Sequence, residues 1–193
     1  MKNTLRAFIA IELNHALRLE LVRAQNELRK SDADIKWVEP DNIHLTLKFL
    51  GDTPVEKVAA VKATLEKTAV AFPVFMIELA GLGAFPNASH PKVIWAGLKE
   101  KPETLASLVA DLENALAGLG CPKETRPFSA HITLGRVRSF RRKERLNEAL
   151  RTVNLSDGSS QKVEKLKLFQ SQLTSEGPMY SVLGEGKLKE QQP

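Results

Sequence analysis

Two short stretches of the chain alternate between polar and apolar residues around a His-x-Thr core. The first covers residues 42–49 with His44 and Thr46, and the second covers residues 129–136 with His131 and Thr133. Such alternation predicts half-buried β-strands, whose successive side chains point to opposite faces of a sheet. Each strand should therefore direct its histidine and threonine to one face and its aliphatic residues to the core.

The apolar pattern around the first motif predicts an alternation of strands and helices. An apolar run over residues 6–13 is too short for a helix and rich in strand formers, so it predicts a buried strand. Asn14 then offers an N-cap for an amphipathic helix over residues 15–30. Residues 35–38 then lead through a turn at 39–41 into the first motif strand. A helix is expected over residues 54–70, a strand over 75–79 and a loop over 81–91.

The same order of elements begins again in the second half of the chain. A strand is expected over residues 92–98, a helix over 102–119 and the second motif strand over 129–136. A basic segment leading into a helix follows over residues 136–153, and a further strand over 162–169. A hairpin is expected over residues 173–182, and the polar residues 186–193 are expected to form a flexible tail.

Several residues recur at a fixed separation, which indicates an internal duplication. The two motif histidines are 131 − 44 = 87 positions apart, and the same separation relates Pro40 to Pro127, Thr46 to Thr133 and Phe8 to Trp95. The alternative is that any alternating α and β chain yields some matches at a freely chosen offset.

The duplication predicts an α+β fold of two lobes related by a pseudo-two-fold axis. Each lobe would be a β-α-β-α-β arrangement, with a central cleft between two sheets and the helices outside. We expect one domain over residues 1–193, with the first lobe roughly 1–85 and the second roughly 90–185. Equivalent strands would then direct both motif histidines into the shared cleft.

Composition restricts the class of protein further. At 42% apolar residues the chain can bury a sizeable core, and its single cysteine, Cys121, argues against a disulfide framework or a thiolate metal site. No signal peptide and no run of transmembrane length is recognisable, so a cytoplasmic protein is expected. The net charge of +5 favours anionic partners, with nucleic acid first, although it is also ordinary for solubility.

Paired histidines can catalyse a displacement at the phosphorus of a phosphodiester without a metal. The reaction needs a base at the nucleophile and an acid at the leaving oxygen, on opposite sides of the phosphorus. An imidazole titrates near neutral pH, so one ring can accept a proton while its mate donates one. The hydroxyls of Thr46 and Thr133 can hydrogen-bond the other phosphate oxygens.

Positive charge near the motifs comes from two candidate phosphate contacts. Lys48 continues the His44 and Thr46 face by alternation, although a lysine at a strand end often only reaches to water. Arg136 lies on the wrong face of a flat strand, but Gly135 permits a bulge that would redirect it. A basic cluster that can guide a polyanion comprises Arg136, Arg138, Arg141, Arg142, Lys143 and Arg145. The alternative for its later members is a solvated helix face. Aromatic residues that can stack a base, if they are not core, are Trp37, Phe49, Phe85, Trp95 and Phe128.

Other interpretations of these histidines are weaker. A metal would be under-coordinated, since neither motif has Cys, Asp or Glu at ligand spacing, and no serine nucleophile elbow is present. Each motif histidine could instead be a hydrogen-bonded core residue, an interpretation that two motifs in matched contexts make less attractive. His15 and His90 are expected to be structural or solvated.

With these residues in hand, the chain resembles the 2H phosphoesterase superfamily, named for two His-x-Thr motifs. Within it the chain is most similar to the bacterial and archaeal RNA 2′,3′-cyclic phosphodiesterases, also called 2′-5′ RNA ligases. The most specific matches are residues 37–51 and 126–136, with departures at Ala130, where proline is common, and at Gly135, where alanine is common. The departures bear on how Arg136 is aimed.

The resemblance implies a two-lobed fold and metal-free opening of a terminal cyclic phosphate to a 2′-phosphomonoester. It further implies that His44 is the proton donor, that His131 is the proton acceptor, and that Thr46, Thr133 and Arg136 hold the phosphate. The motif spacing alone does not distinguish donor from acceptor, because a two-fold pair is symmetric.

The expected function is therefore hydrolysis of RNA 2′,3′-cyclic phosphate ends by a monomer without cofactor or metal, with 2′-5′ ligation as a side activity. Two alternatives stay open. One is a phosphodiesterase for small cyclic nucleotides such as ADP-ribose cyclic phosphate, and the other is a non-catalytic RNA- or nucleotide-binding module.

Overall fold

The computed structural model describes residues 3–99, 102–175 and 177–190. Within them the chain is a mixed α+β fold, as expected. The strands are β1 (Thr4–Glu12), β2 (Ile35–Trp37), β3 (His44–Pro54), β4 (Phe75–Phe85), β5 (Val93–Leu98), β6 (Ile132–Val137), β7 (Ser160–Val163), β8 (Lys165–Leu173) and β9 (Pro178–Lys187). The α-helices are α1 (His15–Arg29), α2 (Val58–Ala69), α3 (Glu103–Ala117) and α4 (Lys143–Thr152), and short 3-10 turns cover Pro40–Asn42 and Val55–Lys57.

The strands form one antiparallel sheet in the order β7-β4-β5-β6-β3-β1-β8-β9, and β2 adds to β6 beside β3. Its two halves meet where β3 pairs with β6, at the single registered pair Leu45–Ile132. These two residues are equivalent in the repeat, since 132 − 45 = 87. An antiparallel pair of equivalent residues places the pseudo-two-fold axis between them, so the expected duplication is visible in the sheet itself.

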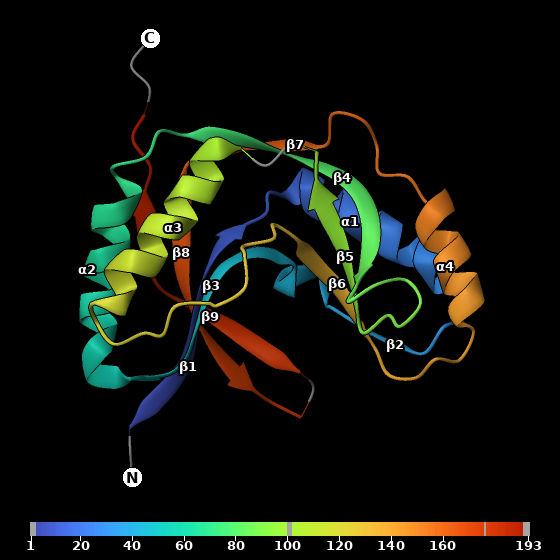
Figure 1. Ribbon diagram of the computed structural model, residues 1–193, viewed down its shortest axis with the longest axis horizontal. Helices are drawn as coiled ribbons and strands as arrows, with labels where there is room; N and C mark the ends of the chain where they lie inside the picture. Colours follow the sequence, from blue (N-terminus) through green and yellow to red (C-terminus); the bar gives the residue numbers. More distant parts are fainter. Residues whose placement is uncertain (1–2, 100–101, 176, 191–193) are drawn as a thin grey trace.

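Each half of the sheet is covered by helices from both halves of the sequence. Helix α2 packs on α3, and α3 contacts β3, whereas α1 packs on α4 (Figure 1). Gln25 of α1 donates its side-chain amide to the carbonyls of Val38 and Leu134, which ties α1 to β6. The first helix of each repeat thus lies over the motif strand of the other repeat. The expected division into lobes 1–85 and 90–185 therefore does not follow the spatial halves.

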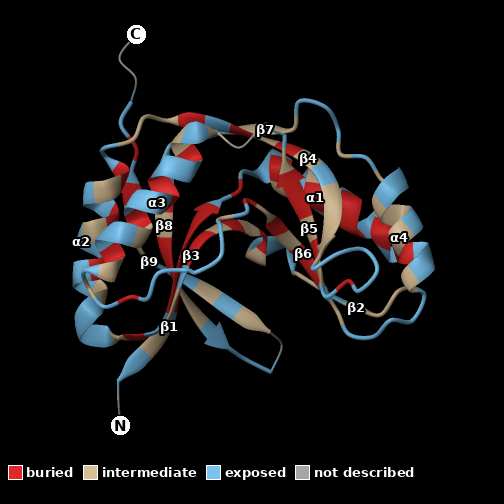
Figure 2. Ribbon diagram, in the orientation of Figure 1, coloured by how far each residue is buried: buried red, intermediate tan, exposed pale blue. Residues whose placement is uncertain are grey.

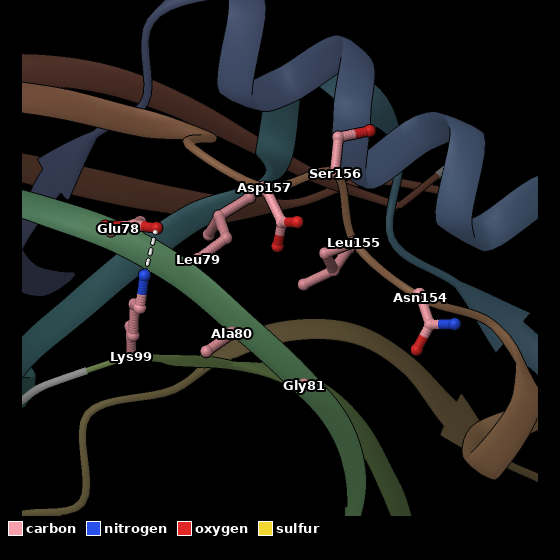
Figure 3. A pocket seen from close by; sticks show the side chains of 9 residues that line it. All are labelled: Glu78, Leu79, Ala80, Gly81, Lys99, Asn154, Leu155, Ser156 and Asp157. Carbon is pink, nitrogen blue, oxygen red and sulfur yellow. Dashed lines mark hydrogen bonds and ion pairs between the residues drawn. The ribbon is translucent and has the colours of Figure 1, made fainter.

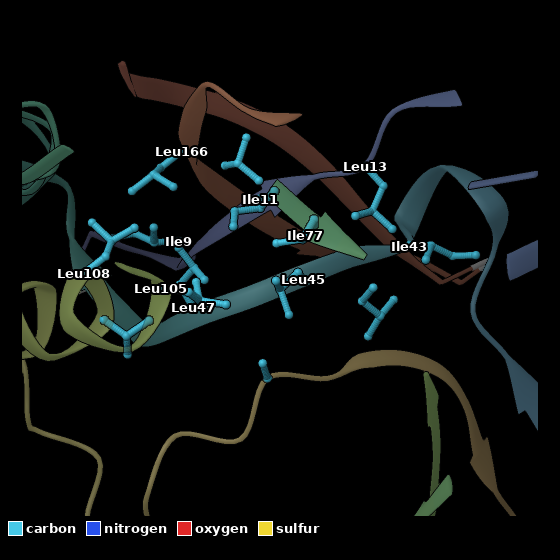
Figure 4. Packing of buried hydrophobic residues seen from close by; sticks show 14 of the residues in the cluster. Ile9, Ile11, Leu13, Ile43, Leu45, Leu47, Ile77, Leu105, Leu108 and Leu166 are labelled. Carbon is cyan, nitrogen blue, oxygen red and sulfur yellow. The ribbon is translucent and has the colours of Figure 1, made fainter. Parts of the chain in front are cut away.

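One hydrophobic core runs through both halves. Buried positions alternate at the start of β4, occupy five consecutive positions of β1, and line one side of α1, α2 and α3 (Figure 2). Leu47 of β3 lies against Leu105 and Leu108 of α3 (Figure 4), and Leu45 and Ile132 at the junction are fully buried. Asn14 caps α1 as expected, with its side-chain oxygen accepting from the Leu17 amide at 2.8 Å. None of the described helices has both the length and the apolar character needed to cross a bilayer.

Three expected elements differ from the structure. Strand β4 continues to Phe85, where a loop was expected from residue 81, because its later residues pair with β5. The expected strand 162–169 is two strands divided at Glu164, since β7 pairs with β4 and β8 with β1. The helix expected from residue 54 begins at Val58, after a 3-10 turn.

The expected flexible tail, residues 186–193, is wrong for its first part. Gly186 and Lys187 belong to β9, and Leu188 is buried and donates its amide to Glu164. Lys189 forms a bridge with Pro73. These backbone pairings hold the chain down in spite of its polar composition, while residues 191–193 lie outside the described part.

The separation of 87 holds for the motif strands but not for the strands beside them. Thr46 pairs with Ala10, and Thr133 pairs with Trp95, so Ala10 and Trp95 are equivalent with a separation of 95 − 10 = 85. The predicted equivalence of Phe8 and Trp95 is therefore wrong by two residues. Both motif strands also carry a register shift at matching places, which shapes the site described next.

Candidate active site

The antiparallel junction brings both motifs to one face of the sheet. Because Leu45 faces Ile132, the antiparallel ladder sets His44 opposite Thr133 and Thr46 opposite His131. Directly opposite residues share a face, and diagonal neighbours have Cα atoms about 7–8 Å apart. His44 and His131 are such a diagonal pair. We call this face, which carries His44, Thr46, His131 and Thr133, the motif face.

Both imidazoles are oriented in the same way. The Nδ1 atom of His44 lies 2.8 Å from the Asn42 carbonyl oxygen, and that of His131 lies 2.7 Å from the Ser129 carbonyl oxygen. A carbonyl only accepts, so Nδ1 carries the hydrogen and Nε2 of the neutral ring keeps its lone pair. Each ring therefore offers Nε2 for proton transfer, with its tautomer fixed by the backbone two residues earlier.

The two rings differ in their surroundings. His44 stacks on Phe8 at 4.8 Å between ring centroids and meets the edge of Tyr180 at 5.4 Å. This burial lowers the pKa of His44, and the hydrogen bond to Asn42 opposes the change only in part. The ring of His131 meets Phe85 edge to face at 4.9 Å, and its hydrogen bond to Ser129 is exposed, whereas that of His44 to Asn42 is partly buried. The pseudo-symmetry therefore holds for orientation and not for environment.

The expectation that Lys48 shares the motif face is wrong. A register shift in β3 between Lys48 and Thr46 interrupts the alternation and turns Lys48 toward α3. Its Nζ lies 2.7 Å from Glu113 Oε2 and 2.9 Å from the Pro122 carbonyl oxygen, and the residue is 4% exposed. Lys48 is thus an interior ion-pair residue, out of reach of a phosphate on the motif face.

Arg136 lies on the motif face because β6 carries the equivalent shift. Leu134 and Gly135 are both buried, and a Cβ on Gly135 would come 2.6 Å from the side chain of Ile35 on the opposite face. The next side chain, Arg136, is therefore exposed on the side of Thr133, as the bulge hypothesis predicted. Tyr180 provides a second indication. Burial raises the pKa of its hydroxyl, and the positive charges of Arg136 and Arg6 oppose that rise.

The aromatic candidates divide between the two faces. Trp37 lies on the helix side beneath Arg29, with the guanidinium 5.1 Å from the ring centroid, and is not available to a base on the motif face. Phe49 is 67% exposed beside Phe8. The Trp95 ring lies so close over Gly83 that a Cβ there would come within 2.4 Å of it. Phe128 packs partly against the core.

Sequence reasoning missed three residues that line the site. Phe8 and Arg6 project from β1 on the motif face, and Tyr180 reaches His44 from β9. For Arg6 and Phe8, simple alternation along β1 could have predicted the shared face. The structure shows this alternation, because Ala7 is buried in the main core on one face while Phe8 lies in a separate aromatic cluster on the other. Tyr180 carried none, since its place depends on how the β8–β9 hairpin folds back.

Two further features of the described residues bear on the site. No three His, Cys, Asp or Glu side chains among them gather as they would to hold a metal ion. A polar hollow between β4 and the segment 154–157 is lined by Glu78, Lys99 and Asp157 among others (Figure 3). None of its lining residues belongs to the motif face, so the hollow is separate from the histidine pair.

Paired His-x-Thr strands across a pseudo-two-fold sheet define the 2H class of phosphoesterases. The chain belongs to the LigT-like phosphoesterase family, whose description is "LigT like Phosphoesterase" and which matches residues 11–95 and again residues 97–180. The double match agrees with the duplication.

Relatives of similar length carry a name for their activity. The chain is 35% identical over 176 residues to an RNA 2′,3′-cyclic phosphodiesterase of Methanothermobacter thermautotrophicus, covering 91% of this chain and 95% of the relative. It is 36% identical over 184 residues to the protein of that name from Aquifex aeolicus, covering 93% and 95%.

A solved structure shares the fold over almost the whole chain. The apo form of E. coli LigT is 27% identical and superposes with a TM-score of 0.81, covering 97% of this chain and 99% of that one. The same protein complexed with 3′-AMP superposes with a TM-score of 0.78 at 26% identity, covering 96% and 98%.

Proposed function

We propose that this protein hydrolyses 2′,3′-cyclic phosphate ends of RNA to 2′-phosphomonoesters without a metal. One observation carries the proposal: two imidazoles on one face, on either side of a pseudo-two-fold axis, both hold Nδ1 on a backbone carbonyl and leave Nε2 free. The names of the related proteins supply the substrate class.

The proposed reaction is an in-line displacement at phosphorus. His131 Nε2 takes a proton from water as the water oxygen bonds to phosphorus, and the bond from phosphorus to O3′ breaks. Protonated His44 gives its Nε2 proton to O3′, which leaves a 3′-hydroxyl and a 2′-phosphomonoester. Solvent then reverses the protonation of the two rings. The donor and acceptor roles come from the resemblance to the superfamily.

The neighbouring side chains would hold the two remaining phosphate oxygens. Thr46 lies opposite His131 and Thr133 opposite His44, so each hydroxyl can donate to a non-bridging oxygen between the rings. Arg136 follows Thr133 on the same face, and its guanidinium suits paired phosphate oxygens. We assign these three residues to substrate binding. Lys48 has no part in it, because its ammonium is buried against Glu113.

A cyclic-ended oligonucleotide incubated with EDTA tests the proposal. We expect wild-type protein to release only 2′-phosphomonoester ends, and His44→Ala or His131→Ala to lower the rate about 100- to 10,000-fold while circular dichroism stays unchanged. His15→Ala is the control, since His15 is an exposed residue at the start of α1. Full activity in either motif variant, or loss of activity with EDTA, would contradict the proposal.

A small cyclic nucleotide is the second candidate substrate. The observation in its favour is the structure of a related protein, E. coli LigT, complexed with 3′-AMP. Comparing kcat/KM for a cyclic mononucleotide and a cyclic-ended oligonucleotide separates the two candidates. We also infer a monomer, because one chain supplies every residue given a role here, and a reducing compartment such as the cytoplasm, which fits free and buried Cys121.

A further inference from the structure

Beyond Arg136, the end of β6 meets two surface loops on the second half of the sheet. The Val137 amide donates to the Lys92 carbonyl at 2.9 Å, and the Arg138 amide donates to the Asp34 carbonyl at 2.8 Å. The first bond joins the end of β6 to the β4–β5 loop (residues 86–92), and the second joins the segment leading to α4 (residues 138–142) to the loop before β2. Both segments therefore lie at the same edge of the sheet, beyond the end of β6 (Figure 1). The edge continues directly from the proposed phosphate site.

Unpaired positive charge follows this edge. Lys36 of β2 lies directly opposite Arg136 in the ladder, and like charges at opposite positions destabilise a sheet. Arg138 is exposed two residues further on. Among the described residues no carboxylate forms an ion pair with these three cations, whereas nearby Arg142 lies 2.9 Å from Asp32. A bound anion would relieve the repulsion between Lys36 and Arg136.

An exposed aromatic pair ends the path. Phe140 is 54% exposed, and His90 meets it edge to face at 6.0 Å between ring centroids. The Lys92 amide donates to the Phe85 carbonyl at 2.7 Å and closes the base of the β4–β5 loop, and within the loop the His90 amide donates to Asn87 Oδ1 at 3.0 Å. Arg142 of the other segment pairs with Asp32. Lys143 Nζ, at the start of α4, lies 6.0 Å from the centroid of the Phe140 ring. Exposed aromatic rings beside cations are the groups on which proteins stack bases of single-stranded nucleic acid.

The distance from the phosphate site indicates the length of the ligand. Thr133 and Val137 are four positions apart in β6, which is about 13 Å at about 3.3 Å per residue, and Phe140 lies three residues further along the chain. A mononucleotide bound at the histidines cannot reach that far. A strand of several nucleotides can, with its phosphates along the cations and a base on Phe140.

We infer that Lys36, Arg136, Arg138, His90 and Phe140 form a binding track for the RNA nucleotides on the 5′ side of the cyclic phosphate. The track would make the protein prefer oligonucleotide ends to cyclic mononucleotides. The inference rests on the proposed function, because it places the reacting phosphate between His44 and His131. It adds a specificity surface that neither motif contains.

Two variants test the track with two substrates. We expect Phe140→Ala to raise KM for a cyclic-ended decanucleotide about 5- to 100-fold, as expected for losing one stacked base, and to leave kcat/KM for a cyclic mononucleotide unchanged. The double variant Lys36→Ala with Arg138→Ala should weaken oligonucleotide binding and reduce the slope of log Kd against log salt by about 1.4, or 0.7 for each cation. Phe140→Tyr, which keeps an aromatic ring, should leave the KM for the decanucleotide near the wild-type value.

Met76→Ala is the matched control, since Met76 is also 54% exposed but lies at the far end of β4. Oligonucleotide KM unchanged in the track variants, or equal losses on both substrates, would overturn the inference. The inference would also be overturned if the track variants weakened the binding of a competing acidic peptide more than they weakened the binding of RNA. If wild-type protein turned over neither substrate, the proposed function would fail instead, and oligonucleotide binding to the variants would still test the track.

Discussion

At the scale of single residues, the backbone determines which nitrogen of each motif histidine is available. Each Nδ1 is held by the carbonyl two positions earlier, Asn42 for His44 and Ser129 for His131. The interaction is local, so it forms wherever the chain enters the strand in this way. The two rings differ in their aromatic contacts and in the effect of burial on His44, and that effect can be measured.

We expect His44 to titrate below its ordinary pKa of about 6.5 in the free protein, because burial against Phe8 disfavours the charged ring. At pH 7 the ring would then be mostly neutral in the free protein. It would take up from solvent the proton that it donates when the anionic substrate binds, because the negative charge of the phosphate favours the imidazolium. Titration of the His44 ring by NMR checks this expectation, with His131→Gln used to assign the signals.

Binding of a nucleoside 2′-monophosphate should move the His44 pKa upward, since a nearby negative charge favours the imidazolium. Phe8→Ala should also move it upward by admitting water. A His44 midpoint above 6.5 in the free protein, or one that phosphate binding lowers, would contradict the assignment of His44 as a buried acid beside the phosphate.

At the scale of elements, matching register shifts in β3 and β6 determine which side chains reach the motif face. Simple alternation predicted His44, Thr46, His131 and Thr133 correctly for their common face, because all four precede the shifts. It failed for Lys48, which follows the shift in β3. Gly135 gave a visible signal for the second shift, whereas the first strand has no glycine before residue 51. A bulge without a glycine depends on how the strand pairs with its neighbour, so the sequence of the strand alone does not predict it.

The shift in β3 also creates a clamp between elements. Glu113 of α3 accepts from Lys48 Nζ at 2.7 Å and from the Glu124 amide at 3.1 Å, while Lys48 also donates to Pro122. The pair thereby holds the loop that leads toward the second motif. Side-chain exposures of 3% for Lys48 and 16% for Glu113 place the pair in the interior.

We expect Lys48→Met to reduce the free energy of unfolding by about 3 kcal/mol, because it leaves the Glu113 carboxylate buried without its partner. Urea unfolding measures the loss. The control is Lys30→Met, whose exposed pair with Glu27 should be worth less than about 1 kcal/mol. The double variant Lys48→Met with Glu113→Met should recover most of the stability. A single variant no more damaging than the control would show that the clamp is not a buried ion pair in solution.

At the scale of the whole molecule, the two repeats exchange elements instead of standing side by side. One strand of each repeat crosses over: β4 of the first repeat pairs with β5 of the second, and β8 of the second repeat pairs with β1 of the first. The sequence could predict the repeat, since identical motifs recur. It could not predict the exchange, because both arrangements bury the same apolar residues and differ only in which copy they pack against.

The exchange predicts that the protein unfolds as one unit. Both tryptophans, Trp37 and Trp95, lie in the half of the sheet made by β2, β4, β5 and β6, so their fluorescence reports on that half. Circular dichroism reports on the whole chain. Because one core crosses the junction at Leu45 and Ile132, we expect both signals to change at the same urea concentration.

Leu45→Ala should sharpen this test. Removing a fully buried side chain at the junction should cost about 2–5 kcal/mol and shift both transitions together, since neither half can keep its core while the other unfolds. Separate lobes would behave differently: the fluorescence and dichroism transitions would move apart in the variant, because only one lobe would lose packing. Coincident transitions in both proteins would show that the motif strands, and with them His44 and His131, stay together until the whole fold is lost.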